Sequence, residues 1–530
     1  MKTIYYNGTL IPMEGELNYA QAICIEDGRI VAVGSDEEIL RYQEDDSQII
    51  DLHQQVMMPG FIDPHSHFFG VVNSLTECDL TDAESFDDIV NLLKDFIEVN
   101  QIPEGEWVAG RNYDQNFLKE KVHPTKDVLD RVSKHHKIKI THVSSHMGCV
   151  NSLVLEEKNI TADTPDPSGG KIHRLPGSQE PSGFLEENAF IHLVQGGNMP
   201  SQEEILKNVQ KAQEMYASYG ITTIQEGMVA QPLYSILTNL ANAGLLHIDL
   251  TGYVDVVTGQ DFMKEDNPFL NQYHNHFKIG GYKIFLDGSP QGCTAWMSKP
   301  YVGQGDYCGY PIYSDEDVEK YIRVALRDHQ QIACHANGDQ ASEQFISMFE
   351  KVKKEEGIEE LYNPILVHCQ FTRKDQLERM KDLKMIPSFF IAHTYYWGDV
   401  HMQNAGKERG ERISSVHDAL DFGLPYTFHQ DSPVVPSDMM KTIWCAVNRI
   451  SKSGQVIGAE QRIGVYDALK GITIHAAMQY GEEKEKGSLT AGKQANLVIL
   501  DQNPITIDPM KIDQIQVLET IIQGHSVYKR

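Results

Sequence analysis

The residues best placed to do chemistry are two histidines that follow an apolar run, in Pro59-Gly60-Phe61-Ile62-Asp63-Pro64-His65-Ser66-His67. On an extended segment, residues i and i+2 point the same way, so His65 and His67 can offer two imidazoles to one metal ion. The alternative is a pair of exposed loop histidines. The apolar run and the Pro-Gly turn favour metal ligation, because barrel enzymes carry their ligands directly after a strand.

Three further side chains end apolar runs downstream. His335 ends Ile332-Ala-Cys-His335, His368 ends Ile365-Leu-Val-His368, and Asp431 follows Tyr426-Thr-Phe-His-Gln. A lone histidine at such a position is more often a hydrogen-bonded core residue. Two of them after a His-x-His pair are better explained by a shared metal centre. A carboxylate at the end of an apolar strand is costly unless it meets a cation or takes part in the reaction.

Apolar runs that alternate with helical ones must position these side chains, and that order is typical of a parallel α/β fold. The downstream strands are expected at residues 281–286, 331–335, 364–368, 385–390 and 425–428, with helices at 315–328, 342–355, 375–383 and 415–421. Upstream, the strand at 56–62 is followed by four candidates, at 106–110, 137–143, 221–225 and 248–254.

An eight-stranded barrel needs only two of those four upstream strands. We therefore expect an insertion within about residues 100–200, where the segment Thr164-Pro-Asp-Pro-Ser-Gly-Gly is rich in turn formers. Long insertions in barrels sit on the βα loops over the active-site mouth, which predicts a cap.

The two chain ends look alike. Short strand-like runs occupy residues 3–6, 20–26, 29–33 and 47–51, with a hairpin signal at Asp27-Gly28, and the pattern resumes at 495–500 and 517–522. Strands from both ends can pair in one small β domain, formed by residues 1–56 and 485–530, around a barrel at 57–484.

The composition indicates which kinds of binding partner the protein can have. The net charge of −29 argues against nucleic acid and anionic membrane surfaces. The eight cysteines form no CxxC pair, and no apolar stretch approaches the roughly 18 residues of a membrane span. The N-terminus has no signal-like segment. We expect a cytoplasmic protein that acts on a small molecule, with a homodimer as the ordinary assembly.

Together these motifs resemble the amidohydrolase superfamily. The segment Lys283-Ile-Phe-Leu-Asp-Gly-Ser289 is similar to the amidohydrolase-3 branch, often called YtcJ-like, which includes N-substituted formamide deformylases. The same branch is suggested by His146 to Ser152, Gly169-Gly170 with Pro181 to Glu186, and Gly487 to Lys493.

The resemblance implies a (β/α)8 TIM-type barrel with a β-sandwich made of both chain ends. It also implies that His65 and His67 hold the more buried metal, and that His335 and His368 hold the more exposed one. Lys283 matches a lysine that becomes an N-carboxylate bridging two metals; a salt bridge to Asp287 or a substrate contact is the alternative. Zinc is the default ion for one or two sites, and Mn, Co, Ni or Fe would also suit the ligands.

Some positions depart from the family pattern or fall near the mouth. His429 replaces a small residue before Asp431, and Asn496 replaces an aspartate in the C-terminal β domain. Candidate substrate contacts, each with a structural alternative, are His146, Tyr113 and Asp114 in the insertion and His393 and Trp397, near His401, after the seventh strand.

The expected reaction is hydrolysis of a carbon–nitrogen bond other than a peptide bond, in an amide or N-formyl-type group, by a metal-activated hydroxide. Asp431 would be both a metal ligand and the catalytic residue that moves the proton. A deaminase, a cyclic-amide or ester hydrolase on the same centre, and a catalytically degenerate regulatory homologue are the alternatives.

Overall fold

The computed structural model describes residues 1–143, 147–167, 170–187, 189–194, 201–359 and 361–530. The chain divides into two compact units. One consists of Met1–Phe68 with Gln213–Arg530, and the other of Phe69–Ala212. Among the described residues, no helix has the length and apolar character needed to cross a membrane.

An eight-stranded parallel sheet forms the centre of the first unit, in the order β20-β19-β18-β17-β16-β15-β14-β7. It curls into the expected TIM-like barrel. Its strands are β7 (Phe61–Ile62), β14 (Ile221–Val229), β15 (Asp249–Asp255), β16 (Phe277–Phe285), β17 (Gln331–Ala336), β18 (Ile365–His368), β19 (Ile386–Phe389) and β20 (Thr427–Phe428). These strands are almost wholly buried, which explains their apolar, non-alternating sequences.

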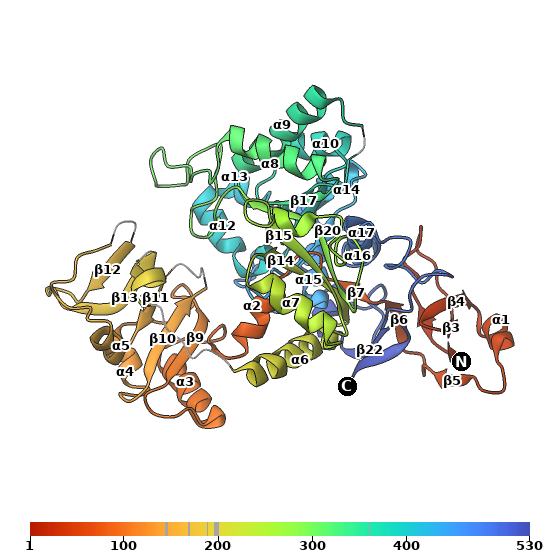
Figure 1. Cartoon of the computed structure of the whole chain (residues 1–530), viewed down its shortest axis with the longest axis horizontal. Helices are drawn as coiled ribbons and strands as arrows, with labels where there is room; N and C mark the ends of the chain where they lie inside the picture. Colours follow the sequence, from red (N-terminus) through yellow and green to blue (C-terminus); the bar gives the residue numbers. More distant parts are fainter. Residues whose placement is uncertain (144–146, 168–169, 188, 195–200, 360) are drawn as a thin grey trace. The chain divides into compact units, whose positions relative to one another are not determined.

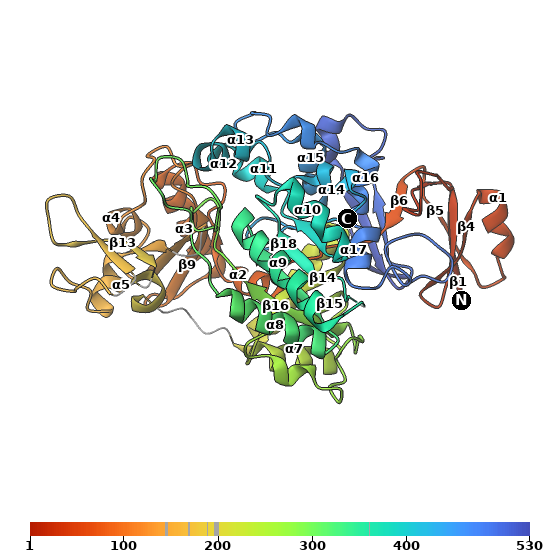
Figure 2. The ribbon, with the colours of Figure 1, turned by 90° about the horizontal axis from the view of Figure 1, so that it is seen from above.

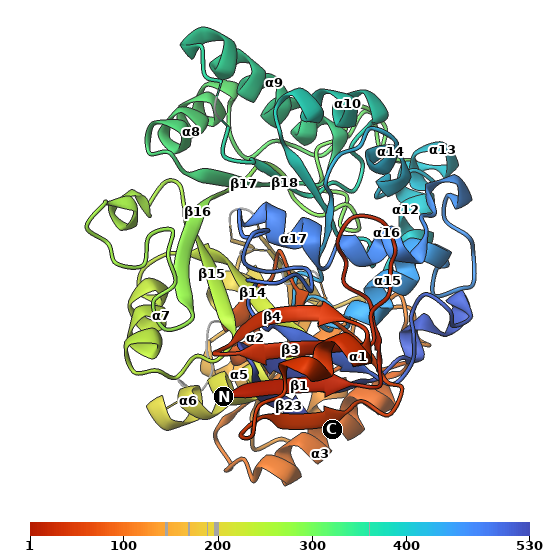
Figure 3. The ribbon, with the colours of Figure 1, turned by 90° about the vertical axis from the view of Figure 1, so that its right-hand side faces the viewer.

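Helices follow the strands and cover the outside of the sheet (Figures 2 and 3). They are α7 (Leu233–Asn242), α8 (Asp315–Arg327), α9 (Asp339–Glu356), α10 (Lys374–Asp382) and α14 (Val416–Asp421). The start of α8 shows how the sequence sets such a helix. The Ser314 hydroxyl accepts the backbone N–H of Asp317, three acidic residues lie in the first turn, and Val318 and Ile322 are buried.

The first and last barrel strands are joined through backbone hydrogen bonds. Ile62 N–H donates to Ile472 O at 2.9 Å, and Phe428 N–H donates to the neighbouring Gly471 O at 3.1 Å. Beyond the strands, His67 N–H donates to Ser432 O at 2.9 Å and Asp431 N–H donates to His65 O at 3.2 Å. The segment after the last strand is therefore fixed beside the segment after the first.

Strands from both chain ends share one five-stranded sheet, as expected. Its order is β2 (Thr9–Leu10), β6 (Val56–Pro59), β21 (Leu497–Leu500), β22 (Val517–Ile522) and β23 (His525–Lys529). A four-stranded sheet of the N-terminal segment has the order β4 (Arg29–Gly34), β3 (Ala22–Glu26), β1 (Lys2–Tyr6) and β5 (Gln48–Asp51). Antiparallel pairing of β6 with β21 joins the two ends.

The expected strand at 56–62 is two strands in two sheets. β6 belongs to the five-stranded sheet and β7 to the barrel. Gly60 lies between them, where a Cβ would come within 2.3 Å of the Thr222 side chain, so only glycine fits this close approach. Strand β23 was not expected from the sequence.

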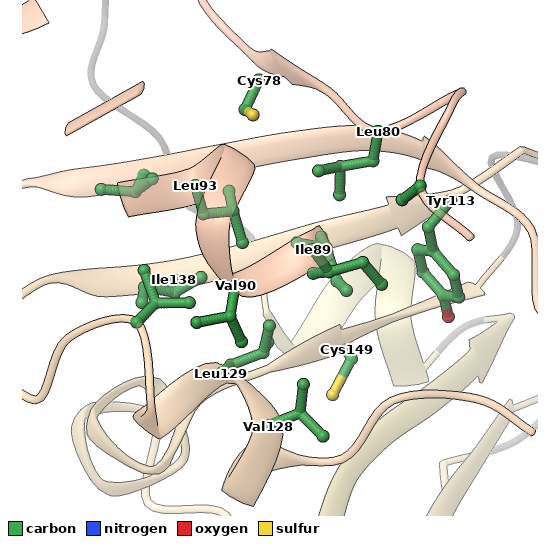
Figure 4. Close-up of a cluster of buried hydrophobic side chains, with 14 of the residues drawn as sticks. Cys78, Leu80, Ile89, Val90, Leu93, Tyr113, Val128, Leu129, Ile138 and Cys149 are labelled. Atoms are coloured by element: carbon green, nitrogen blue, oxygen red, sulfur yellow. The ribbon is translucent and has the colours of Figure 1, made fainter. Parts of the chain in front are cut away.

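The second unit has its own six-stranded sheet, in the order β12-β13-β11-β10-β9-β8 (orange to yellow in Figure 1). The strands are β8 (Cys78–Asp79), β9 (Trp107–Tyr113), β10 (Lys137–His142), β11 (Met147–Val150), β12 (Gly170–Arg174) and β13 (Pro181–Glu187), with helices α3 (Phe86–Asn100), α4 (Lys126–Asp130) and α5 (Ser152–Glu157). Figure 4 shows its apolar core, in which Ile89 and Leu93 of α3 lie near Ile138 of β10. The two surplus upstream strands, β9 and β10, belong here.

Candidate metal centre

His65, His67 and Asp431 come together where the first and last barrel strands end. Asp431 Oδ1 lies 3.5 Å from His65 Nε2 and 3.3 Å from His67 Nε2. One ligand atom from each residue lies within 4.8 Å of the other two. Asp431 Oδ1 is buried and accepts no hydrogen bond from the described residues. A buried carboxylate oxygen of this kind, facing two imidazole nitrogens, fits a cation between the three.

Hydrogen bonds behind the two histidines turn their Nε2 atoms toward Asp431. His65 Nδ1 lies 2.5 Å from the Gln225 side-chain oxygen, and the Gln225 amide in turn donates to Pro64 O at 2.8 Å. His67 Nδ1 lies 3.5 Å from Glu226 Oε1. A metal-binding imidazole needs this second partner, because it fixes the ring and keeps the other nitrogen unprotonated.

The carboxylates around His67 stabilise positive charge in this half of the centre. Burial lowers the pKa of His67, but the carboxylates of Asp431 and Glu226 outweigh it and raise the value to about 9. Burial opposes ionisation of Asp431 too, yet His67 and the neighbouring histidines hold the pKa of that carboxyl well below its usual range. A divalent ion that displaces the His67 proton would therefore meet two carboxylates able to balance its charge.

His335 and His368 form the other half of the centre. His335 Nδ1 faces His368 Nε2 at 2.9 Å, and the His65 and His368 rings are 5.5 Å apart between centroids. Burial, with Lys283 nearby, lowers the pKa of His335 to about 3, and burial holds the pKa of His368 well below 6.5. Both rings are therefore neutral at pH 7 and can act as ligands.

Lys283 points into the same cluster from strand β16. Its side chain is fully buried, and Nζ lies 3.4 Å from His65 Nε2. The expected alternative, a salt bridge to Asp287, is not formed. The Asp287 carboxylate accepts backbone N–H groups instead, from Trp296 at 2.9 Å, Asn337 at 2.9 Å and Gly338 at 2.7 Å. Burial lowers the pKa of Lys283 to about 8.

Two residues of the centre have unusual backbone conformations. His368 has φ of 79° and Asp431 has φ of 52°, in the left-handed region that disfavours a side chain. Such a conformation costs on the order of 1–3 kcal/mol and persists only where the surroundings enforce it. Left-handed backbone also occurs at many turn residues of this chain; at His368 and Asp431 it fixes the direction in which two side chains of the cluster leave the strand ends.

The candidate substrate contacts fall in both units. In the first, His393 lies in a group of buried rings, 4.5 Å from the Phe390 ring and 4.6 Å from the Trp397 ring, and its Nδ1 lies 3.0 Å from His401 Nε2. In the second, the Tyr113 hydroxyl lies 3.2 Å from His123 Nδ1, and Asp114 Oδ1 lies 3.9 Å from His142 Nε2. His146 is outside the described residues.

Sequence reasoning missed Gln225 and Glu226, the partners of His65 and His67. Both lie in β14 (Ile221–Val229) and are buried. The available signal was the polar pair itself, because a glutamine followed by a glutamate is out of place in an otherwise buried barrel strand.

A family model for the amidohydrolase family matches residues 48–528. This chain belongs to the amidohydrolase family. It is 26% identical to YtcJ of Bacillus subtilis (strain 168) over 555 residues, with 100% of both chains covered. It is 25% identical to the N-substituted formamide deformylase of Arthrobacter pascens over 537 residues, covering 99% of this chain and 98% of the relative.

The fold also matches a crystal structure of an uncharacterized metal-dependent hydrolase from Pyrococcus horikoshii OT3. The TM-score is 0.77 at 25% identity, with 96% of this chain and 99% of that chain covered. The resemblance to the amidohydrolase-3 branch is thereby confirmed. With the cluster of His65, His67 and Asp431, these matches identify a metal-dependent hydrolase of the amidohydrolase superfamily.

Proposed function

We propose that this amidohydrolase cleaves the carbon–nitrogen bond of a small amide or N-formyl-type compound. The observation that carries the proposal is the position of Asp431 Oδ1, a buried oxygen that accepts no hydrogen bond from the described residues and stands beside the Nε2 atoms of His65 and His67. The full-length similarity to an N-substituted formamide deformylase supports this substrate class.

His65, His67 and Asp431 would hold one divalent ion, and His335 and His368 a second, with zinc as the default and Mn, Co, Ni or Fe as alternatives. When bound, such ions lower the pKa of water from 15.7 to about 7 and polarise the scissile carbonyl. The protein supplies neutral imidazoles for this purpose, since burial keeps His335 and His368 uncharged.

Asp431 is the proton carrier in this proposal. Its carboxylate accepts the proton of the attacking water and then delivers it to the leaving nitrogen, so that the amine departs neutral. The backbone hydrogen bond from Asp431 N–H to His65 O holds this carboxylate beside the histidines throughout.

Lys283 is proposed to carry a carboxylate on Nζ. The neutral amine forms an N–C bond with CO2 and loses one proton, which gives an anion able to bridge two cations. Three features support this chemistry. The side chain is fully buried, it forms no salt bridge with Asp287, and its Nζ lies 3.4 Å from His65 Nε2, at the centre of the histidine cluster.

The unit Phe69–Ala212 is proposed to be a cap that contributes to substrate binding. It is inserted directly after the segment that carries His65 and His67, on the loop that follows the first barrel strand. Insertions on such loops serve as active-site covers. If Tyr113 and Asp114, or His393 and Trp397, contact substrate, their replacement raises KM more than it lowers kcat.

The test is a substrate panel with protein reconstituted with Zn²⁺ or Mn²⁺. N-formyl amines, N-acyl amines, cyclic amides, esters and aminated heterocycles are compared by kcat/KM. We expect the N-formyl or N-acyl compounds to be cleaved fastest. Faster turnover of a heterocyclic amine or an ester would replace the proposed reaction, and metal-loaded protein inactive on the whole panel would favour a regulatory role.

A further inference from the structure

His429 stands directly behind His368 and is one of the least exposed histidines of the barrel. Its side chain is fully buried, and its Nε2 lies 3.1 Å from His368 Nδ1. On the other side of the ring, Nδ1 lies 2.9 Å from the Ser388 hydroxyl of β19. The Phe390 ring, 5.2 Å away, and the His65 ring, 5.1 Å away, flank it. Both nitrogens are engaged, and packing restricts the ring.

His335, His368, His429 and Ser388 form a hydrogen-bonded chain of side chains. The positions of the protons along it decide which nitrogen His368 can offer to a cation. His368 Nε2 faces His335 Nδ1 at 2.9 Å, so without a cation one of these two atoms must carry a proton. For His368 Nε2 to offer its lone pair, the proton of that neutral ring must sit on Nδ1. An Nδ1–H group needs an acceptor, and the acceptor within reach is His429 Nε2.

The Ser388 hydroxyl completes the chain, because it can accept a hydrogen bond as well as donate one. When Ser388 accepts from His429 Nδ1–H, the lone pair of His429 is on Nε2 and can accept from His368 Nδ1–H. When Ser388 donates, the chain runs in reverse and leaves the His368 proton on Nε2, where it blocks a ligand bond. A hydroxyl at this position permits the chain to switch without any change in net charge.

Building on the two-ion centre proposed above, we propose that His429, supported by Ser388, is a positioning residue for the second metal ion. It accepts the His368 Nδ1 proton and so directs His368 Nε2 toward the ion held with His335. His65, by contrast, has its own partner in Gln225. The effect of His429 is therefore confined to the His335–His368 half of the centre.

The experiment measures both metal affinities of the full-length protein, by Zn²⁺ competition against a chromophoric chelator and by the visible spectrum of the Co²⁺-loaded form. His429→Phe keeps a ring of similar size but removes both nitrogens. We expect it to bind the first equivalent normally and the second roughly 10- to 100-fold more weakly, the usual range for loss of such a partner. His429→Gln retains an amide oxygen that can accept from His368, so its second affinity should stay within about threefold of wild type, well short of that range.

Ser388→Ala tests the outer end of the hydrogen-bonded chain with a smaller change in packing. It replaces His429→Phe as the test if that variant does not fold. It should weaken the second equivalent alone, by less than His429→Phe does. His136→Phe is the matched control. His136 is also buried, with Nδ1 on the Ser133 hydroxyl at 2.8 Å and Nε2 on Ile102 O at 3.0 Å, but it belongs to the second unit. The His136→Phe protein should bind both metal equivalents with wild-type affinity.

Three results would overturn the inference while leaving the two-ion centre intact. These are two normal affinities in His429→Phe and Ser388→Ala, equal loss of both equivalents in either variant, and a His429→Gln protein as weak as His429→Phe. A wild-type protein that binds only one equivalent would instead contradict the two-ion centre itself.

Discussion

Two buried lysines of the barrel have opposite environments. Lys486, at the end where the strands begin, lies 2.9 Å from Glu482 Oε2 and also pairs with Asp249, the first residue of β15. Lys283, near the end of β16, has no carboxylate partner among the described residues and faces His65. Burial lowers the pKa of both amines, but the carboxylates outweigh it at Lys486 and raise the pKa, whereas the pKa of Lys283 is lowered to about 8.

This difference separates a structural ion cluster from a functional one. At the end of the barrel where the strands begin, Lys278 and Lys486 share Glu482. His276 Nδ1 lies 2.7 Å from Asp249, so each of these charges has a partner within the fold. At the end where the strands finish, Lys283 has no carboxylate partner among the described residues, and Asp431 Oδ1 faces only the imidazoles of His65 and His67, at 3.5 and 3.3 Å. Where every buried charge is paired inside the protein, the cluster has a structural role. Where buried charges lack such a partner at the end of the barrel that binds substrates, we expect a ligand to provide it.

The largest expected effect is on stability, from Lys486→Met. The change leaves Asp249 and Glu482 buried without their shared cation, which costs about 3–5 kcal/mol. Urea unfolding of the metal-free proteins measures it. Lys283→Met is the matched control and should be nearly neutral, because it removes a buried cation that has no carboxylate partner. Equal destabilisation by the two variants would break the comparison.

Asp431→Asn addresses the cluster at the end where the strands finish. It keeps the size of the side chain but removes the proton carrier, so kcat should fall by at least about 10²-fold, the lower range for general acid–base catalysis. Metal content should fall much less, because the histidines remain. Steady-state kinetics and elemental analysis on the same samples check both points. Near-normal turnover would make Asp431 structural, and complete loss of metal would make it primarily a ligand.

Metal content sharpens the role of Lys283. We expect the reconstituted wild-type protein to hold two equivalents of a transition metal, and Lys283→Met to bind one of them at least about tenfold more weakly, since it cannot form a bridging anion. Carbon-13 NMR after growth or exchange with labelled bicarbonate should show a carbamate signal in wild type that the variant lacks. Less than a tenth of an equivalent in wild type would refute the centre altogether.

Much of the barrel could be predicted because its strands are buried on both faces. The runs that become β16 to β20 are short and apolar, and each is followed by a helix or a polar turn. The histidines were recognisable as a set, because one histidine at the end of such a run is usually a core residue, whereas two of them after a His-x-His pair are better explained by a shared metal centre. Similar strand patterns at the two chain ends predicted a β domain shared by both ends, but the strand that pairs with β21 is β6, which was expected in the barrel.

The remaining features depend on contacts between segments distant in sequence. Periodicity cannot show that the run 56–62 changes sheets at Gly60, because the cause is the approach of Thr222. Nor can it show that Gln225 and Glu226 orient His65 and His67, or that His429 meets both His368 and Ser388. These partners become visible only when the barrel strands are side by side.

The smallest expected effect is on the pH dependence of the unfolding free energy, through Asp249 and its partners Lys486 and His276. Burial works to raise the pKa of Asp249, but Lys486 and His276 lower it from 3.8 to about 2. The folded-state pKa is below the unfolded one, so this carboxylate stabilises the protein above pH 3.8 and loses the contribution as pH falls through about 2. Asp249→Asn lacks that dependence. Its deficit in unfolding free energy relative to wild type should therefore shrink by about 1 kcal/mol between pH 5 and pH 3. A deficit that stays constant over this range would mean that Asp249 contributes through packing and not through its charge.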